Sequence, residues 1–137
     1  MAIYGISYIN ESYVDNIHQQ LPKIAQEIFD ILDSNIDYDY DQIIFRDNIS
    51  DGSYSIKFWL KSGNKTYDCF KTIGKSKCIN IFSQCDKVVR PFWKSLKDKD
   101  KFSRLTIVFN KSGSFNIQIE YSDNVMSSDE WEDKYLQ

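Results

Sequence analysis

The sequence is poor in the residues from which catalytic and metal centres are usually built. Its 137 residues include one histidine, His18, and three cysteines. His18 can be interpreted as a catalytic residue or as an exposed residue on a helix. We favour the second, because no serine, cysteine or acid accompanies it in a triad-like arrangement. The cysteines lack the paired spacing that zinc sites require. We therefore expect no enzymatic activity, no cofactor and no metal.

The three cysteines, Cys69, Cys78 and Cys85, are expected to be free and buried thiols. Cys78 and Cys85 are seven residues apart and fall on one face of a predicted helix. Their separation along such a helix is about 10 Å, which is too far for a disulfide. Free thiols are typical of reducing compartments, and we expect this protein to be cytoplasmic.

The sequence also lacks long apolar runs and a recognisable export signal. No run approaches the length needed to cross a membrane, and residues 1–10 have neither a basic region nor an extended apolar core. We therefore expect no membrane partner. Hydrophobic residues still make up 42% and aromatic residues 15% of the chain, which excludes a disordered protein. The length predicts a single domain over residues 1–137.

Two segments resemble ligand-binding motifs but lack essential positions. Gly74-Lys75-Ser76 matches only the end of the phosphate-binding frame G-x-x-x-x-G-K-[ST], and we interpret it as the start of a helix. The acidic segment from Asp33 to Asp41 lacks the central glycine and the terminal glutamate of an EF-hand loop. The sequence therefore predicts neither a nucleotide site nor an EF-hand calcium site.

The clearest fold signal lies between Lys101 and Tyr121. Phe115, Ile117 and Ile119 alternate with polar residues, which indicates a strand with one buried face. A glycine-containing turn at residues 110–114 separates this run from an earlier apolar run at residues 102–109. The pattern predicts a β-hairpin.

The other patterns complete an α+β domain. We expect a central antiparallel sheet of about five strands, packed with two longer helices and a short C-terminal helix. Apolar residues at three- and four-residue steps predict helices over residues 11–34 and 76–97, with kinks or restarts at Pro22 and Pro91. Residues 1–10 fit either an edge strand or an arm. The further strands are expected over residues 43–46, 54–61 and 65–72, and the last helix over residues 129–136.

Charge is distributed very unevenly along the chain. Residues 1–56 carry ten acids and two bases, whereas residues 57–101 carry twelve bases and four acids. The remaining residues, 102–137, carry six acids and three bases. This division predicts electrostatically distinct faces.

The acidic segment after the first helix also contains tyrosines. Tyrosines among carboxylates offer good contact area for a basic protein partner, but the segment can also be a solvated turn. The sequence leaves both interpretations open. If the segment does bind a basic partner, acids of the last helix form a second patch of the binding surface. The candidate partner-binding residues are Asp33, Asp37, Tyr38, Asp39, Tyr40 and Asp41, with Glu130, Glu132 and Asp133 as the second patch.

A competing hypothesis uses the basic middle of the chain. Lys57 and Lys61 flank Trp59 on one face of a predicted strand, as in surfaces that bind single-stranded nucleic acid. Alternatively, a helix covers Trp59 and leaves the lysines at the rim, and we favour this arrangement. We therefore do not expect direct binding of nucleic acid. The competing site would consist of Lys57, Trp59, Lys61, Lys65, Lys75 and Lys77.

The order of the predicted elements and several residues resemble the YezG-like family of bacterial immunity proteins over about residues 12–136. The matching positions are Ile24-Ala25-Gln26-Glu27-Ile28, Leu105-Thr106-Ile107, Gly113-x-Phe115-x-Ile117, Tyr121-x-Asp123 and Trp131-x-x-Lys134-Tyr135-Leu136. The resemblance implies a small acidic antitoxin that binds a secreted or contact-delivered toxin, typically a nuclease domain, inside the producing cell. None of the matching positions is a catalytic motif.

The charge pattern agrees with an inhibitory role. A nuclease presents a basic groove to the phosphates of its substrate, and a carboxylate-rich surface can occupy such a groove. We therefore expect an immunity protein that neutralises a cognate toxin of contact-dependent growth inhibition or another secretion system. The alternative is a small nucleic-acid-binding module that uses residues 57–101.

Overall fold

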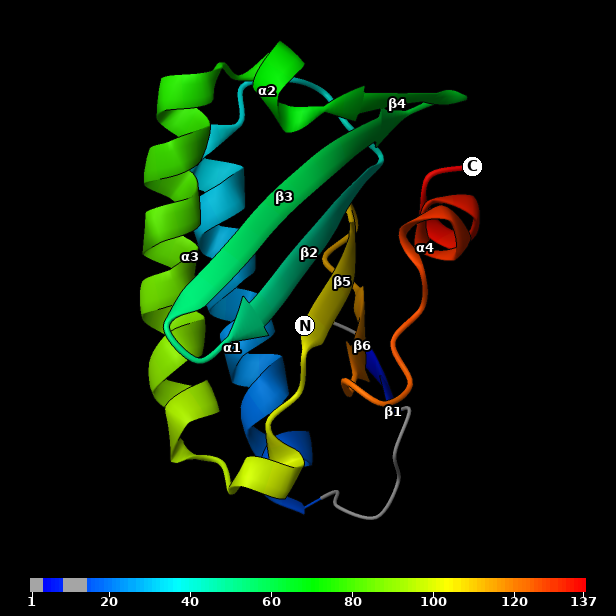
Figure 1. Cartoon of the computed structure of the whole chain (residues 1–137). Helices are drawn as coiled ribbons and strands as arrows, with labels where there is room; N and C mark the ends of the chain where they lie inside the picture. Colours follow the sequence, from blue (N-terminus) through cyan, green and yellow to red (C-terminus); the bar gives the residue numbers. More distant parts are fainter. Residues whose placement is uncertain (1–3, 9–14) are drawn as a thin grey trace.

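The computed structural model describes residues 4–8 and 15–137, with side chains from residue 19 onward. In this part of the chain, six strands form one sheet with helices on both faces (Figure 1). The elements in chain order are β1 (Tyr4–Tyr8), α1 (Asp15–Asn35), β2 (Gln42–Ser50), β3 (Ser53–Ser62), β4 (Lys65–Asp68), α2 (Cys69–Thr72), α3 (Lys75–Ser95), the 3-10 helix η1 (Asp98–Asp100), β5 (Arg104–Asn110), β6 (Phe115–Glu120) and α4 (Ser128–Tyr135).

The strands lie in the order β1-β6-β5-β2-β3-β4. The pairs among β2 to β6 are antiparallel, so the expected α+β fold with an antiparallel sheet of five strands is confirmed. The hairpin expected between Lys101 and Tyr121 is the pair β5 and β6. β1 adds a parallel strand beside β6, with Ile6 opposite Ile117. Residues 4–8 therefore adopt the edge strand that was one of the two alternatives for the N-terminal segment.

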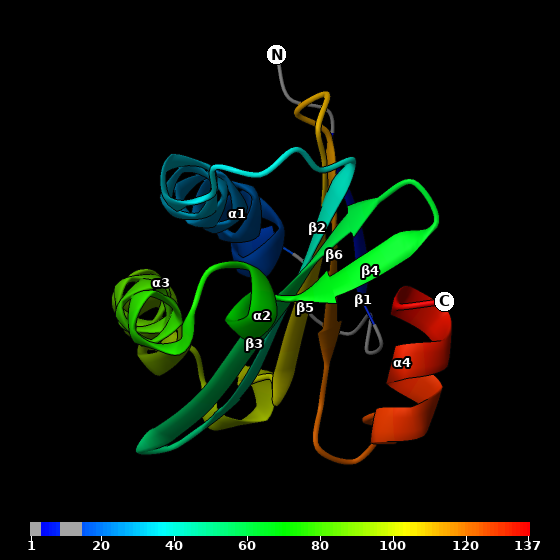
Figure 2. The same ribbon diagram turned by 90° about the horizontal axis from the view of Figure 1, so that it is seen from above.

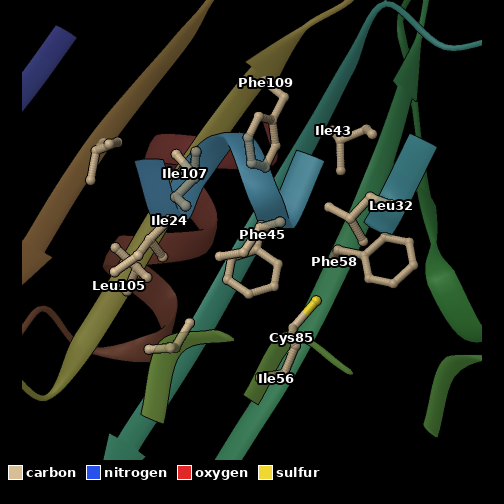
Figure 3. Close-up of a cluster of buried hydrophobic side chains, with 14 of the residues drawn as sticks. Ile24, Leu32, Ile43, Phe45, Ile56, Phe58, Cys85, Leu105, Ile107 and Phe109 are labelled. Carbon is tan, nitrogen blue, oxygen red and sulfur yellow. The ribbon is translucent and has the colours of Figure 1, made fainter. Parts of the chain in front are cut away.

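The main core lies between the sheet and the two long helices. α1 and α3 cover one face of the sheet, and α4 covers the other (Figure 2). Ile24, Ile28 and Leu32 recur along one side of α1 and are buried in one cluster with Phe45 and Phe58 of the sheet. Figure 3 shows this cluster of side chains. Full burial of such a side chain stabilises a fold by about 1.5–3 kcal/mol, so this layer provides most of the apolar stabilisation.

A smaller core fixes α4 on the opposite face. Trp131 of α4 is buried against Ile44 and Trp59, and its indole N–H donates a 3.0 Å hydrogen bond to the Thr106 hydroxyl. Ser127 caps the helix by accepting a 3.2 Å hydrogen bond from the Glu130 amide. A single aromatic side chain with a polar tip therefore anchors the C-terminal helix.

β4 is shorter than the sequence suggests. The expected strand over residues 65–72 ends at Asp68, where the chain turns into α2. The Asp68 carboxylate accepts a 2.8 Å hydrogen bond from the Phe70 amide and thereby caps the new helix. The expectation for residues 69–72 is wrong because this local side-chain hydrogen bond competes with continued strand pairing.

Neither long helix is interrupted by its proline. α1 continues through Pro22 and α3 through Pro91, so the restarts that the sequence suggested are absent. Buried residues lie on both sides of each proline, for example Leu21 and Ile24 in α1. Packing of these faces outweighs the one backbone hydrogen bond that a proline removes. The expected start of the first helix near Glu11 lies outside the described residues.

Candidate functional site

We call residues 36–41, which connect α1 to β2, the acidic loop. It lies at the end of the sheet where the β3–β4 and β5–β6 turns are also found (Figure 1). Asp41 joins the loop to both turns. Its carboxylate accepts a 2.7 Å hydrogen bond from the Gly63 amide, and its carbonyl accepts a 2.9 Å bond from the Lys111 amide. Asp41, which the sequence suggested as a contact residue, is exposed and also has a structural role in the loop.

Tyr40 is an internal anchor of the same loop. Only 8% of the residue is exposed, and its hydroxyl donates a 2.9 Å hydrogen bond to the Asp33 carboxylate at the end of α1. Burial, together with the hydrogen bond and charge of Asp33, raises the pKa of Tyr40 to about 12. Tyr40 is thus a supporting residue, while Asp33 keeps an exposed carboxylate beside it.

Tyr38 projects from the loop and is 55% exposed. On the described surface it borders hollows of about 540, 390 and 270 Å³. The largest is also lined by Asp33, Asp37 and Asp39. An exposed tyrosine with hollows on several sides gives a partner both a contact ring and recesses into which its own side chains fit.

The charge around Tyr38 is mostly uncompensated. Asp37 and Asp39 are exposed, and the nearest cation to Asp39 is the Lys111 ammonium at 3.9 Å. Both members of that pair face solvent, so the pair contributes little to stability and leaves Asp39 free to exchange partners. Lys77 lines the hollow on the α3 side of Tyr38, so the acidic surface ends there.

The second acidic patch does not adjoin the first. Glu130, Glu132 and Asp133 are exposed on α4, and none of the hollows that Tyr38 borders is lined by α4. Glu130 belongs to the cap of its own helix through Ser127. Burial lowers the pKa of Arg46, and nearby Arg104 lowers it further, while the charge of Glu132 opposes both effects. Glu130 thus takes part in the cap of α4, and Glu132 interacts electrostatically with Arg46 of β2.

The basic site of the competing hypothesis is closed at its centre. Trp59 is only 7% exposed and packs against Trp131 with 5.2 Å between ring centroids. The Lys57 ammonium is 2.7 Å from the Asp68 carboxylate. The arrangement that we favoured, in which a helix covers Trp59, is confirmed. Three lysines of that hypothesis remain on the surface without the aromatic platform between them, namely Lys65, Lys75 and Lys77.

Sequence reasoning missed a second exposed tyrosine beside the loop. Tyr67 of β4 is 41% exposed and lines the 270 Å³ hollow with Tyr38. The alternation of β4 placed Tyr67 on one face of a strand but gave no sign that the acidic loop would meet that face. Phe70 of α2 is also exposed, with 38% of the residue open to solvent.

A buried carboxylate was missed as well. Asp47 of β2 is fully buried, and neither of its oxygens has a hydrogen-bond partner within the described residues. Burial raises the pKa of Asp47 to about 7, with a further increase from Asp86 and an opposing effect from Arg90. The signal in the sequence was an acid among apolar residues in a strand, at a position that alternates with core residues. Asp47 lies beneath α3, away from the acidic loop.

The remaining candidate residues have simple environments. Cys69, Cys78 and Cys85 are buried free thiols, and burial is the main cause that raises the pKa of each. The side chain of His18 lies outside the described part of the structure. Among the described residues, no group of three or more His, Cys, Asp or Glu side chains is placed to hold a metal ion. Within the same residues, every helix is too short or too polar to cross a membrane.

No protein-family model matches the chain, and no curated protein matches it.

Proposed function

We propose that this protein is an immunity protein that binds a cognate bacterial toxin inside the producing cell and neutralises it. The observation that carries the proposal is the exposed Tyr38 between Asp37 and Asp39, at a hollowed end of the sheet. The resemblance to the YezG-like family supports the same function.

The chemistry of this surface favours a basic partner. Carboxylates that remain in water contribute little to binding, but carboxylates desolvated against Arg or Lys contribute strongly and accelerate association. A nuclease domain carries such basic residues where it holds phosphates. We therefore propose a nuclease as the class of toxin, with the acidic loop facing its basic groove.

The internal supports of the loop agree with a binding role. Tyr40 and Asp41 hold the loop from within, through Asp33 and Gly63. A loop that is already ordered loses less conformational entropy when it binds than a flexible one does. The contacts are therefore assigned to Asp33, Asp37, Tyr38 and Asp39, and the supports to Tyr40 and Asp41.

The test is a binding titration against the toxin encoded beside this gene. The variant is the double substitution Asp37→Asn/Asp39→Asn, which leaves Asp41 and its bond to Gly63 intact. The matched control is Asp51→Asn/Asp123→Asn, which removes the same charge from two exposed residues elsewhere. We expect the loop variant to lose at least about thirtyfold in affinity, since truncating one desolvated charge costs about 2–5 kcal/mol. Its association rate should also lose much of its dependence on salt.

A third variant, Tyr38→Ala, measures the aromatic contribution. A central exposed tyrosine that becomes buried in an interface typically costs about 2 kcal/mol or more on truncation. Equal affinities for the wild type, the loop variants and the control would remove this surface from the interface. Failure of the wild type to bind the toxin, together with tight binding to RNA or DNA, would instead favour the nucleic-acid hypothesis.

A further inference from the structure

β3 has an unpaired edge over half of its length. β4 pairs only with Trp59 to Ser62, because the chain leaves the sheet at Asp68. Figure 1 shows β4 beside only the upper part of β3. From Ser53 to Phe58, β3 has β2 on one side and no strand of the described chain on the other.

The register identifies which backbone groups face outward. The Ile49 amide of β2 donates to the Ser103 carbonyl, so the odd-numbered residues of β2 point toward β5. The even-numbered residues of β2 therefore pair with β3, where their partners are odd-numbered, such as Ser55 opposite Asn48. It follows that the N–H and C=O groups of Tyr54 and Ile56 point away from the sheet. Within the described residues no backbone group bonds to them across that edge.

This open edge has a defined length. At one end, β3 reaches α2, where the backbone amide of Phe58 favours the thiolate of Cys69 and so opposes the rise in the pKa of that thiol. At the other end, the chain turns through Gly52, which has a φ of 80°. Near that turn, Arg90 of α3 donates to the carbonyls of Ser50 and Ser53 at 2.7 and 2.9 Å. A strand of about five residues fits between these limits.

We propose that a second copy of this chain occupies the edge, with the two β3 strands antiparallel across a two-fold axis at Ser55. In this register Tyr54 lies opposite Ile56 of the second copy, and Ile56 lies opposite its Tyr54. These two pairs form about four backbone hydrogen bonds, and Ser55 faces its own counterpart in the non-hydrogen-bonded position.

The side chains and charges are self-complementary in this register. A tyrosine opposite an isoleucine is a favourable cross-strand pair. Tyr54 is exposed in the single chain, whereas Ile56 already lies in the main core, so the tyrosine of the second copy extends that core at its edge. Lys57 lies opposite Ser53, so no like charges face each other, and Asp68 already balances Lys57 at 2.7 Å. The lengths also match, because the same segment of about five residues is the open edge of one copy and the strand that the other copy supplies. The dimer uses no residue of the acidic loop and does not depend on the proposed function.

The register is tested with a cysteine at the axis. Ser55→Cys places two thiols in a non-hydrogen-bonded pair, where the Cβ atoms lie closer together than in a hydrogen-bonded pair and approach the separation of about 3.5–4.5 Å that a disulfide needs. Ser53→Cys is the matched control, because it faces Lys57 and not itself, and the three native cysteines are buried. Under mild oxidation we expect a disulfide-linked dimer for Ser55→Cys at a rate at least tenfold above that of Ser53→Cys.

The interaction itself is tested by sedimentation velocity over a concentration series. Tyr54→Pro removes an outward amide without touching the ladder to β2, so the variant keeps its fold, as circular dichroism would show. We expect its dimer dissociation constant to rise about tenfold to a hundredfold, because each dimer loses two hydrogen bonds. In the wild type, hydrogen exchange at Tyr54 and Ile56 should slow as the concentration rises.

Three results would overturn the proposal. One is a wild type that stays monomeric at every concentration tested. Another is equal crosslinking of Ser55→Cys and Ser53→Cys. The last is slower exchange at Tyr54 and Ile56 only after the toxin is added, which would assign this edge to the toxin instead of a second copy.

Discussion

The Tyr40 hydroxyl donates a 2.9 Å hydrogen bond to the Asp33 carboxylate and so joins the acidic loop to the last turn of α1. Tyr40→Phe keeps the buried ring and removes only this bond. We expect a loss of about 1 kcal/mol in the free energy of unfolding. Chemical denaturation measures it, and Tyr38→Phe, which alters an exposed hydroxyl, is the control. Equal losses for the two variants would contradict the anchoring role of Tyr40.

The same pair predicts how stability changes at high pH. The folded-state pKa of Tyr40 is raised to about 12 from its ordinary value of 10.0, with burial as the first cause. The stability associated with the neutral phenol is therefore complete below pH 10 and is lost as the pH rises toward 12. Tyr135 has a pKa raised to about 12 as well, so the measurement is the difference between wild type and Tyr40→Phe. A constant difference from pH 9 to 12 would rule the effect out.

Asp41 supports the loop through a different bond. Asp41→Ala removes the acceptor for the Gly63 amide, which sits in the β3–β4 turn at a φ of 61°. We expect a destabilisation of about 1–3 kcal/mol, together with faster amide exchange at Gly63. Asp39→Ala, which removes an exposed carboxylate two residues earlier, should change stability by less than about 0.5 kcal/mol. Unchanged exchange at Gly63 in Asp41→Ala would contradict this role.

Asp47 should make the protein less stable at neutral pH than at mildly acidic pH. Its folded-state pKa is raised from 3.8 to about 7, first by burial and then by Asp86. The folded state therefore retains a proton that the unfolded state has released, and stability falls as the pH rises from about 4 to about 7. We expect Asp47→Asn to remove this fall and to gain up to about 3–4 kcal/mol at pH 8.

The control for Asp47 is Asp51→Asn, which makes the same change at an exposed position in the following turn. Thermal unfolding of the three proteins between pH 4 and 8 gives the comparison. A parallel pH dependence in wild type and Asp47→Asn would show that the buried carboxyl is not the source of the fall.

Trp131 should be the most sensitive position on the α4 side of the sheet. It is fully buried and packs against Trp59 and Tyr135, with 5.2 and 4.9 Å between ring centroids, and its indole N–H donates to the Thr106 hydroxyl. We expect Trp131→Ala to cost about 3–5 kcal/mol, and we expect α4 to detach before the rest of the protein unfolds. Denaturation followed by hydrogen exchange resolves the two steps. Loss of both helix layers at one denaturant concentration would contradict a separate detachment.

Some of this architecture follows directly from the order of residues. Period-two alternation predicted β6 correctly, because Phe115, Ile117 and Ile119 are buried on one face of the strand. The polar residues of the other face were expected to meet water, but α4 covers part of that face, and Glu120 is fully buried there. The strand over residues 65–72 was predicted too long, because a cap made by Asp68 is a local hydrogen bond that hydrophobic periodicity does not report. The hollow that Tyr38 and Tyr67 both line depends on which turns meet at one end of the sheet, and this is a property of the whole topology.

The candidate residues also divide into those whose environment the sequence predicted and those whose environment depends on the folded arrangement. The exposure of Asp37 and Asp39 was predictable, since acids in a loop seldom become buried. Tyr40 and Asp41 have the same residue types, yet the structure uses them as supports. Their different roles come from register, because Tyr40 meets Asp33 and Asp41 meets the Gly63 turn only after α1 and β3 are in place.

The parallel pairing of β1 with β6 has a consequence for synthesis. Tyr4 lies opposite Phe115, so β1 pairs with a strand that is synthesised more than a hundred residues later. At about 5–20 residues per second, β1 waits on the order of ten seconds for its neighbour. Closing so long a loop also makes this pairing a late event in refolding of the complete chain. A nascent chain that stalls before residue 115 therefore holds an N-terminal strand without the neighbour it pairs with in the finished sheet.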